Sequence, residues 1–197
     1  MWGKDYDKNL VQPWRNFMPV ELLIAMLRDP ASTGALLPSS RALARAMANA
    51  ATGADLIVEL GAGTGAVTRA LLHAQPHVPL IAVELQPPLA QRLKACCPTA
   101  DVRQAAAKEV VDALIDAQGK VVLISSLPFR SLPRRVASET ATCLCRFLER
   151  NPARKLVQFT YQPRAPFGAP PGLQWQRTSV VWRNTPPAGI WELQAVS

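Results

Sequence analysis

Three glycines and a carboxylate stand at a spacing that suits the binding of a nucleoside-containing cofactor. Gly61, Gly63 and Gly65 directly follow a β-branched run and directly precede a helical pattern. Glycine lets the backbone turn tightly and approach a ligand closely, and the start of the helix supplies N–H donors. Glu84 stands nineteen residues past Gly65, at the end of the next β-branched run, where a carboxylate can accept hydrogen bonds from both hydroxyls of a ribose. The pattern therefore predicts a nucleoside site at the end of a strand.

The same spacing also fits a dinucleotide-binding fingerprint, in which Ala66 would be the last small residue. Two features oppose that interpretation. Glu59 stands two residues before Gly61, where its charge would repel a pyrophosphate and attract an ammonium group. A chain of 197 residues also leaves no room for a separate substrate domain. The residues therefore favour a cofactor that carries an amino-acid ammonium group.

Alternating strands and helices must position these residues. Short β-branched runs recur between stretches of helical periodicity, which predicts a parallel, doubly wound sheet. The last two strands are separated only by the turn sequence Asn-Thr-Pro-Pro-Ala-Gly, which predicts an antiparallel hairpin that closes the sheet. The predicted strands are 55–60, 80–84, 101–104, 120–125, 155–161, 175–183 and 190–196, and the predicted helices are 66–74, 89–95, 108–117 and 133–149, with an earlier helix that begins at 38–40.

The net charge of +8 indicates a polyanionic partner, and the charge is unevenly placed. Residues 120–183 hold 11 basic residues against two acidic ones, and the chain has 16 arginines, whose planar fork suits phosphate recognition. A hydrophobic content of 49% excludes a disordered chain. No apolar run reaches the roughly 18 residues that span a bilayer, and the N-terminus lacks the apolar core of a secretory signal.

The cysteines and histidines show no metal-binding pattern. The cysteines lack both C-x-x-C and zinc spacing, and His73 and His77 have no partner ligands. We therefore expect no metal site, and we interpret the cysteines as buried, reduced thiols of a cytosolic protein. They are Cys96, Cys97, Cys143 and Cys145.

The stretch Val58–Thr68 resembles the first motif of class I S-adenosylmethionine-dependent methyltransferases, and Glu84 matches their acidic second motif. The resemblance implies a Rossmann-like α/β fold, with N-terminal helices and a mostly parallel seven-stranded sheet closed by an antiparallel C-terminal hairpin. It implies the cofactor S-adenosylmethionine, with S-adenosylhomocysteine as product. Glu59 would help hold the methionine end of the cofactor, and Glu84 would bind its ribose. The other implied cofactor-binding residues are Gly61, Ala62, Gly63, Thr64, Gly65 and Ser125.

Four further segments resemble the bacterial phospholipid N-methyltransferases that act on phosphatidylethanolamine. They are Thr33–Arg41, Ser125–Pro133, Phe159–Pro163 and Trp182–Ala188. The implied function is methyl transfer from S-adenosylmethionine to the amine of phosphatidylethanolamine, and to its methylated intermediates. The implied partners are the phospholipid substrate and an anionic membrane surface, and we expect a monomer that does not bind nucleic acid.

Two other interpretations stay open. Ribosomal RNA adenine N6-methyltransferases have similar glycine loops, but they usually carry Asn-Leu-Pro-Tyr where this chain has Ser126–Phe129, and they usually add a helical RNA-binding domain. Without that Asn, the amino group of a base would lose its main acceptor. The other alternative is a cofactor- and membrane-binding protein without turnover, because Arg103–Ala107 lacks the Asp that many class I members place near the adenine.

The substrate would contact aromatic and basic residues that follow the fourth and fifth predicted strands. Tyr161 would orient the amine through its hydroxyl or through its ring face, which attracts cations, and Phe129 would form a second wall. The phosphodiester requires cations, and Arg130, Arg134 and Arg183 are expected where substrates enter folds of this kind. Three other arginines are interpreted as a solvated helix face, namely Arg146, Arg150 and Arg154.

Residues 1–30 are predicted to form an amphipathic leader helix ahead of the methyltransferase domain, residues 31–197. Most residues from 14 to 27 are apolar, and Arg15 and Arg28 flank this run. Such a segment can lie in a membrane interface with its arginines on lipid phosphates, or it can pack on the edge of the sheet. We therefore expect a cytoplasmic protein that is peripheral at the inner face of the membrane.

Overall fold

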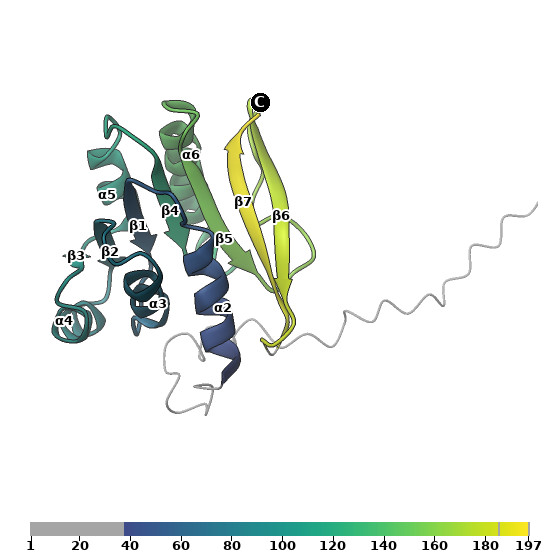
Figure 1. Cartoon of the computed structure of the whole chain (residues 1–197). Helices are drawn as coiled ribbons and strands as arrows, with labels where there is room; N and C mark the ends of the chain where they lie inside the picture. Colours follow the sequence, from purple (N-terminus) through teal and green to yellow (C-terminus); the bar gives the residue numbers. More distant parts are fainter. Residues whose placement is uncertain (1–37, 185, 197) are drawn as a thin grey trace, which may run out of the picture.

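The computed structural model describes residues 38–184 and 186–196, and its centre is a seven-stranded sheet (Figure 1). The strands are β1 (Leu56–Leu60), β2 (Leu80–Glu84), β3 (Asp101–Gln104), β4 (Val121–Ser125), β5 (Lys155–Thr160), β6 (Leu173–Val181) and β7 (Ala188–Ala195). Their order is β3-β2-β1-β4-β5-β7-β6, and β1 to β5 run parallel. β7 runs antiparallel to both of its neighbours. The predicted mostly parallel sheet closed by an antiparallel hairpin is confirmed.

Helices cover both faces of the sheet. They are α2 (Pro38–Asn49), α3 (Ala66–Ala74), α4 (Pro87–Cys96), α5 (Ala107–Ala113) and α6 (Arg134–Glu149). On one face α2, α3 and α4 bury Met47, Leu71 and Leu93, and on the other face α5 and α6 bury Val111 and Leu144. Figure 1 shows α2 and α6 on opposite sides of β5. Strands covered on both faces are mainly apolar, which explains the hydrophobic runs 56–58 in β1 and 121–124 in β4.

Several boundaries differ from the predicted ones. α4 begins at Pro87, two residues before the predicted start, because proline is tolerated in the first turn of a helix, where no N–H is needed. The hairpin pairs Val181 with Ala188, so both of its strands begin and end earlier than predicted. Its turn is residues 182–187 rather than 184–189, and the Asn184 side chain closes it with a hydrogen bond to the carbonyl of Pro186 at 2.7 Å.

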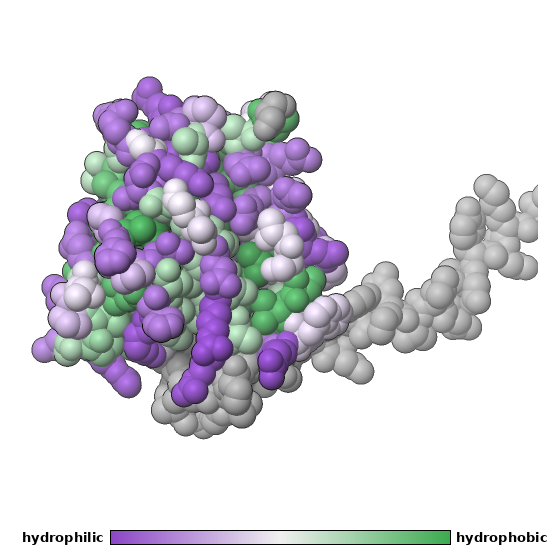
Figure 2. All heavy atoms as spheres, viewed as in Figure 1, coloured by the Kyte–Doolittle hydropathy of each residue, from purple (hydrophilic) through white to green (hydrophobic). Residues whose placement is uncertain are grey.

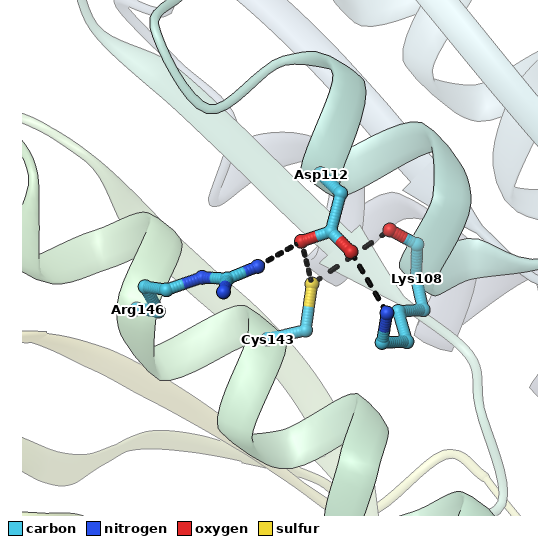
Figure 3. A network of polar contacts seen from close by, with 4 residues as sticks. All are labelled: Lys108, Asp112, Cys143 and Arg146. Atoms are coloured by element: carbon cyan, nitrogen blue, oxygen red, sulfur yellow. Dashed lines mark hydrogen bonds and ion pairs between the residues drawn. The ribbon is translucent and has the colours of Figure 1, made fainter.

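Asp112 joins α5 to α6 (Figure 3). Its carboxylate accepts hydrogen bonds from Lys108 Nζ at 2.9 Å, from Cys143 Sγ at 3.2 Å and from the guanidinium of Arg146. Burial, together with the hydrogen bond to Asp112, raises the pKa of Cys143 to about 12, so this thiol stays protonated. Arg146 keeps 57% of its side chain exposed, so it lies on a solvated helix face as predicted, although it also bonds to Asp112 on another helix.

Arg154, in contrast, is buried, with only 2% of its surface exposed, which corrects its interpretation as part of a solvated helix face. Its guanidinium donates to the carbonyls of Phe147 at 2.7 Å, Ile115 at 3.0 Å and Ala117, and it lies 4.0 Å from the centre of the Phe147 ring. The carbonyls of residues 115 and 117 lie where α5 was predicted to continue, but they face Arg154 instead, and the helix ends at Ala113. One side chain therefore satisfies backbone acceptors from the ends of two helices.

We expect Arg154→Lys to lower the free energy of unfolding by about 2 kcal/mol, because one ammonium cannot reach all three carbonyls and a buried acceptor is left unpaired. Thermal and denaturant unfolding followed by circular dichroism would measure this loss. Arg150→Lys is the matched control, since Arg150 is exposed and its replacement should change stability by less than about 0.5 kcal/mol. Equal unfolding midpoints for Arg154→Lys and the wild type would contradict the stabilising role of the Arg154 hydrogen bonds.

Three of the four cysteines are buried, but Cys96 is exposed, which corrects the prediction of four buried thiols. Cys96 is the last residue of α4, and neighbouring positions at the end of a helix face in different directions, so Cys97 enters the core while Cys96 does not. All four are free thiols. Burial raises the pKa of Cys145 to about 11, so it stays protonated at neutral pH.

The predicted leader helix, residues 1–30, lies outside the described residues, and so does most of the segment Thr33–Arg41. The leader therefore stays a prediction. Of the helices that the structure describes, none combines the length and the apolar character needed to cross a membrane.

Candidate functional site

The predicted site residues gather at the carboxyl ends of the parallel strands, which lie at the lower side of the sheet in Figure 1. The strand order turns back between β1 and β4, and ligands of open α/β sheets bind at such a switch point. The N–H of Ser126 donates to the carbonyl of Leu60 at 2.9 Å, so the loop after β4 lies beside the loop after β1. We call this region the carboxyl edge. It consists of loops 61–65, 85–86, 105–106 and 126–133, residues 161–165, and the turn 182–187.

The glycine loop between β1 and α3 requires its glycines. Gly61, Gly63 and Gly65 have φ angles of +77°, +56° and +79°, in the left-handed region that glycine enters most readily. A Cβ added to Gly61 would meet Leu127 Cδ2 at 3.1 Å, and one added to Gly65 would meet Leu93 Cδ1 at 2.6 Å. A Cβ on Gly63 would meet nothing within 4 Å. Gly63 therefore faces the open side of the loop, where a ligand can approach the backbone.

Backbone hydrogen bonds and one arginine hold this loop in shape. The N–H of Ala62 donates to the carbonyl of Val83 at 3.0 Å, and the N–H of Gly65 donates to the carbonyl of Ala62 at 2.9 Å. The carbonyl of Thr64 accepts a hydrogen bond from Arg69 Nη1 at 3.1 Å. The loop is thus anchored to β2 on one side and to α3 on the other.

Glu59, on β1, is completely buried under α3. Its Oε2 accepts a hydrogen bond from Thr68 Oγ1 at 2.6 Å, and its Oε1 has no partner among the described residues. Burial raises the pKa of Glu59 to about 7, because the carboxylate is removed from water. A buried carboxylate oxygen requires a donor, and a cationic donor would restore the charged form.

Glu84, at the end of β2, faces the same loop and is 6% exposed. Its Oε2 accepts the N–H of Gly63 and its Oε1 accepts the N–H of Gln86, each at 2.8 Å. Each oxygen keeps a lone pair for one further donor, such as a ribose hydroxyl. Two carboxylates beside one glycine loop oppose a pyrophosphate, which weakens the dinucleotide interpretation further.

Gln158 is a site residue that the sequence analysis missed. It is buried on β5 next to Ser125 on β4, and its Nε2 donates to the carbonyl of Leu127 at 3.1 Å. Its Oε1 has no partner among the described residues. Ser125, a predicted cofactor residue, is also buried, and its Oγ accepts the N–H of Leu127 at 3.3 Å. A single amide within the apolar run of β5 was the feature that could have identified Gln158.

Tyr161 lies directly after β5 at the carboxyl edge and is half-buried. Its ring meets that of Phe159 edge-on at 5.5 Å, and the Asn184 side chain near its hydroxyl opposes the rise in pKa that burial causes. Burial raises the pKa of Tyr161, so the hydroxyl is protonated at neutral pH. The hydroxyl can therefore donate or accept a hydrogen bond, but it is not an anionic base.

Phe129, the predicted second wall, is only 7% exposed. Its ring lies 4.7 Å from that of Phe167, which contacts Trp175 at 5.0 Å. This aromatic cluster packs with the core on the α5 and α6 face, whereas Tyr161 packs on the α2 and α3 face. The structure does not bring the two predicted walls together, because a large ring at the end of a strand gains more from burial in the core than from exposure at the edge.

The three predicted phosphate-binding arginines all lie at the carboxyl edge or border it. Arg130 donates to the carbonyl of Ala165 at 3.1 Å, and its pKa is lowered by burial and by the neighbouring Arg164. Arg134 begins α6, and Arg183 lies in the turn after β6, where both are exposed. Within the described residues, neither these three arginines nor Arg164 forms an ion pair with a carboxylate.

No family model matches this sequence, and no curated protein matches it. Solved structures do match. The structure is similar to 1,6-didemethyltoxoflavin-N1-methyltransferase from Burkholderia thailandensis with bound 1,6-didemethyltoxoflavin and S-adenosylhomocysteine, at 12% identity and a TM-score of 0.57, covering 90% of this chain and 87% of that one. It is also similar to the putative methyltransferase yhhF from Escherichia coli, at 16% identity and a TM-score of 0.56, covering 82% of this chain and 89% of that one. The 23S rRNA methyltransferase ErmE matches at 16% identity and a TM-score of 0.51, and the match covers 79% of this chain and 68% of that one.

The chain has the class I methyltransferase fold. Similarity at these identities shows the fold and not the substrate. The chain also spans only about half the length of two further matched proteins, the mitomycin 7-O-methyltransferase MmcR and TrmN from Thermus thermophilus.

The donors and acceptors at the switch point of this methyltransferase fold suit S-adenosylmethionine. Glu59 Oε1 can accept a hydrogen bond from the ammonium of a methionine moiety, and Glu84 can accept hydrogen bonds from a ribose. The open side of Gly63 admits a ligand between them. Across residues 38–184 and 186–196, no group of three or more His, Cys, Asp or Glu side chains could hold a metal ion.

Proposed function

We propose that the chain is an S-adenosylmethionine-dependent methyltransferase. The observation that carries this proposal is the buried Glu59 Oε1, which lacks a partner at the switch point of a class I methyltransferase fold. Glu84 and the open side of Gly63 complete a site for a ligand that has both an ammonium group and a ribose. When bound, S-adenosylmethionine supplies an electrophilic methyl group on a sulfonium.

The proposed substrate is phosphatidylethanolamine. Three segments that resemble phospholipid N-methyltransferases, residues 125–133, 159–163 and 182–188, all lie at the carboxyl edge. Gln158, which directly precedes the second segment, donates a hydrogen bond to the carbonyl of Leu127 in the first. The Asn184 side chain of the third segment lies near the Tyr161 hydroxyl of the second. This convergence supports one substrate site built from distant parts of the chain. Arg130, Arg134 and Arg183 would bind the phosphodiester at its rim.

Methylation requires a neutral amine with its lone pair directed at the methyl group. A primary amine has an unperturbed pKa of roughly 10, so most substrate arrives protonated. A pocket of low dielectric lowers that pKa, and the neutral Tyr161 hydroxyl can then fix the direction of the nitrogen. The protein would contribute mainly orientation and desolvation, with no covalent intermediate.

Labelled S-adenosylmethionine tests the proposal directly. We expect label to pass to phosphatidylethanolamine vesicles and not to ribosomal RNA. An RNA adenine methyltransferase is the second candidate, because the unpaired arginines at the carboxyl edge also suit RNA phosphates. Label in the RNA alone would favour that candidate, and cofactor binding without label transfer to either acceptor would indicate a protein without turnover.

Tyr161→Phe should lower the turnover of phosphatidylethanolamine about tenfold, because the amine loses the hydroxyl that orients it. Cofactor affinity should stay unchanged, since Tyr161 does not contact the glycine loop. Turnover assays at saturating cofactor and titration calorimetry would measure the two quantities. Wild-type turnover in Tyr161→Phe would remove Tyr161 from the proposed mechanism.

A further inference from the structure

The turn between β6 and β7 exposes a tryptophan at the carboxyl edge. Trp182 is 76% exposed, more than any other large hydrophobic residue that the structure describes. The turn around it is well held, since Asn184 is 6% exposed and donates its N–H to the carbonyl of Val181 at 3.2 Å and its Nδ2 to that of Pro186 at 2.7 Å. An ordered turn that holds a large aromatic side chain in water suggests a partner that covers it.

This turn lies beside the proposed substrate site. Thr160 pairs with Gly189, and Val181 pairs with Ala188, so the turn stands next to the end of β5. The Asn184 side chain, which closes the turn, also lies near the Tyr161 hydroxyl. Figure 2 shows hydrophobic residues gathered on this part of the surface, between α2 and the ends of β6 and β7. A partner that covers the turn would therefore face the substrate site.

The charge of the carboxyl edge indicates the chemistry of that partner. Its loops contain three arginines and neither Asp nor Glu, and Arg134 follows directly. The carboxylates of Glu59 and Glu84, at the ends of β1 and β2, are buried. Among the described residues the loops of this edge are thus positive without an acidic residue of their own, whereas the loops at the opposite ends of the strands include Asp55 and Asp116. The three arginines are Arg130, Arg164 and Arg183.

We propose that the carboxyl edge docks on an anionic phospholipid bilayer, with Trp182 in the interface and the arginines on lipid phosphates. Tryptophan favours the boundary between hydrocarbon and water, and each arginine near an anionic surface adds electrostatic attraction. The inference rests on the proposed function, because docking of this edge lets the substrate amine enter without leaving the membrane. RNA would also bind the arginines, but the hydrophobic surface between α2 and the ends of β6 and β7 in Figure 2 favours lipid.

Sedimentation of the full chain with vesicles of phosphatidylcholine and 20% phosphatidylglycerol, which contain no substrate, tests the docking. We expect Trp182→Ser to weaken binding about tenfold and Arg183→Gln about fivefold. Two controls lie away from this edge: Val196→Ser removes another exposed hydrophobic residue, and Arg150→Gln removes another exposed arginine. Both should bind within about twofold of the wild type, and circular dichroism would verify that each variant is folded.

Wild-type vesicle binding by Trp182→Ser would overturn the proposal, and so would equal losses in the two controls. If Trp182→Ser and Arg183→Gln weaken binding to an RNA oligonucleotide but not to vesicles, the edge is an RNA surface. Activity distinguishes this proposal from the proposed function. Trp182→Ser should lose a larger share of its turnover on vesicles than on a short-chain, monomeric phosphatidylethanolamine. Vesicle binding that depends on Trp182, with no methylation of either form by the wild type, would support docking and contradict the proposed function.

Discussion

Glu59→Gln should weaken S-adenosylmethionine binding at least about 100-fold and at the same time stabilise the cofactor-free protein at neutral and higher pH. The carboxyl is completely buried, and its pKa of about 7 lies well above the ordinary value of 4.5. Below pH 4.5 it is neutral in the folded and the unfolded chain, so it has no effect on stability. Between pH 4.5 and 7 the unfolded chain ionises this group while the folded chain keeps it protonated, so the folded state is progressively destabilised, by about 3 kcal/mol at pH 7 and above.

Glutamine has nearly the same shape, keeps an acceptor for Thr68 and carries no charge. Its amide would place an unpaired donor where Oε1 now lies, which offsets part of the gain. We therefore expect the free energy of unfolding of Glu59→Gln to exceed that of the wild type by about 2 kcal/mol at pH 8. Below pH 4.5 only the cost of the unpaired amide donor remains, so Glu59→Gln should there be slightly less stable than the wild type. Denaturant unfolding at pH 4 and pH 8 would measure the reversal.

Cofactor affinity should change in the opposite direction. A buried carboxylate and an ammonium form a charge-assisted hydrogen bond, and its loss should weaken binding at least about 100-fold. In the wild type the affinity should fall about tenfold per pH unit below pH 7, because Glu59 must first lose a proton. The variant should lack this slope. Titration calorimetry from pH 5.5 to 8.5 would measure both effects, with the exposed Glu149→Gln as control, and wild-type affinity in Glu59→Gln would refute the cofactor assignment.

The glycine loop and the order of the elements could be predicted because their causes are local. Positive φ angles at Gly61, Gly63 and Gly65 are a property of three residues, and a buried parallel strand is visible as an apolar run. The sequence therefore predicted the glycine loop, and the structure places the two predicted carboxylates, Glu59 and Glu84, beside it. The same local reasoning placed the hairpin, although its register was shifted.

Contacts between distant parts of the chain could not be predicted. Arg154 lies in a polar stretch that is typical of solvent-exposed loops, and it is buried only because the carbonyls of Ile115, Ala117 and Phe147 converge on it. Phe129 has the residue type expected of a substrate wall, but the packing of Phe167 decides the direction of its ring. For a residue that follows the end of a strand, residue type and spacing do not indicate on which face of the sheet its side chain will pack.

Gly65→Ala and Gly63→Ala should separate the fold of the glycine loop from its role in binding. At Gly65 the φ of +79° disfavours alanine, and the new Cβ would lie 2.6 Å from Leu93 Cδ1. Leu93 is 1% exposed and cannot move aside, so strain and overpacking should together lower the free energy of unfolding by about 3 kcal/mol. Gly65→Ala leaves the open side of Gly63 free. The folded part of this variant should therefore lose cofactor affinity only if strain at residue 65 moves the glycine loop.

Gly63→Ala should show the reverse. Its φ of +56° gives the alanine a cost of about 1 kcal/mol, and the methyl group meets no protein atom within 4 Å. That space is where the proposed cofactor lies, so affinity for S-adenosylmethionine should fall at least about tenfold while the melting temperature changes little. Calorimetric titration and thermal unfolding of both variants would measure the contrast. Wild-type affinity in Gly63→Ala would mean that the open side of the loop is not the cofactor site, because nothing else in the described structure competes for that space.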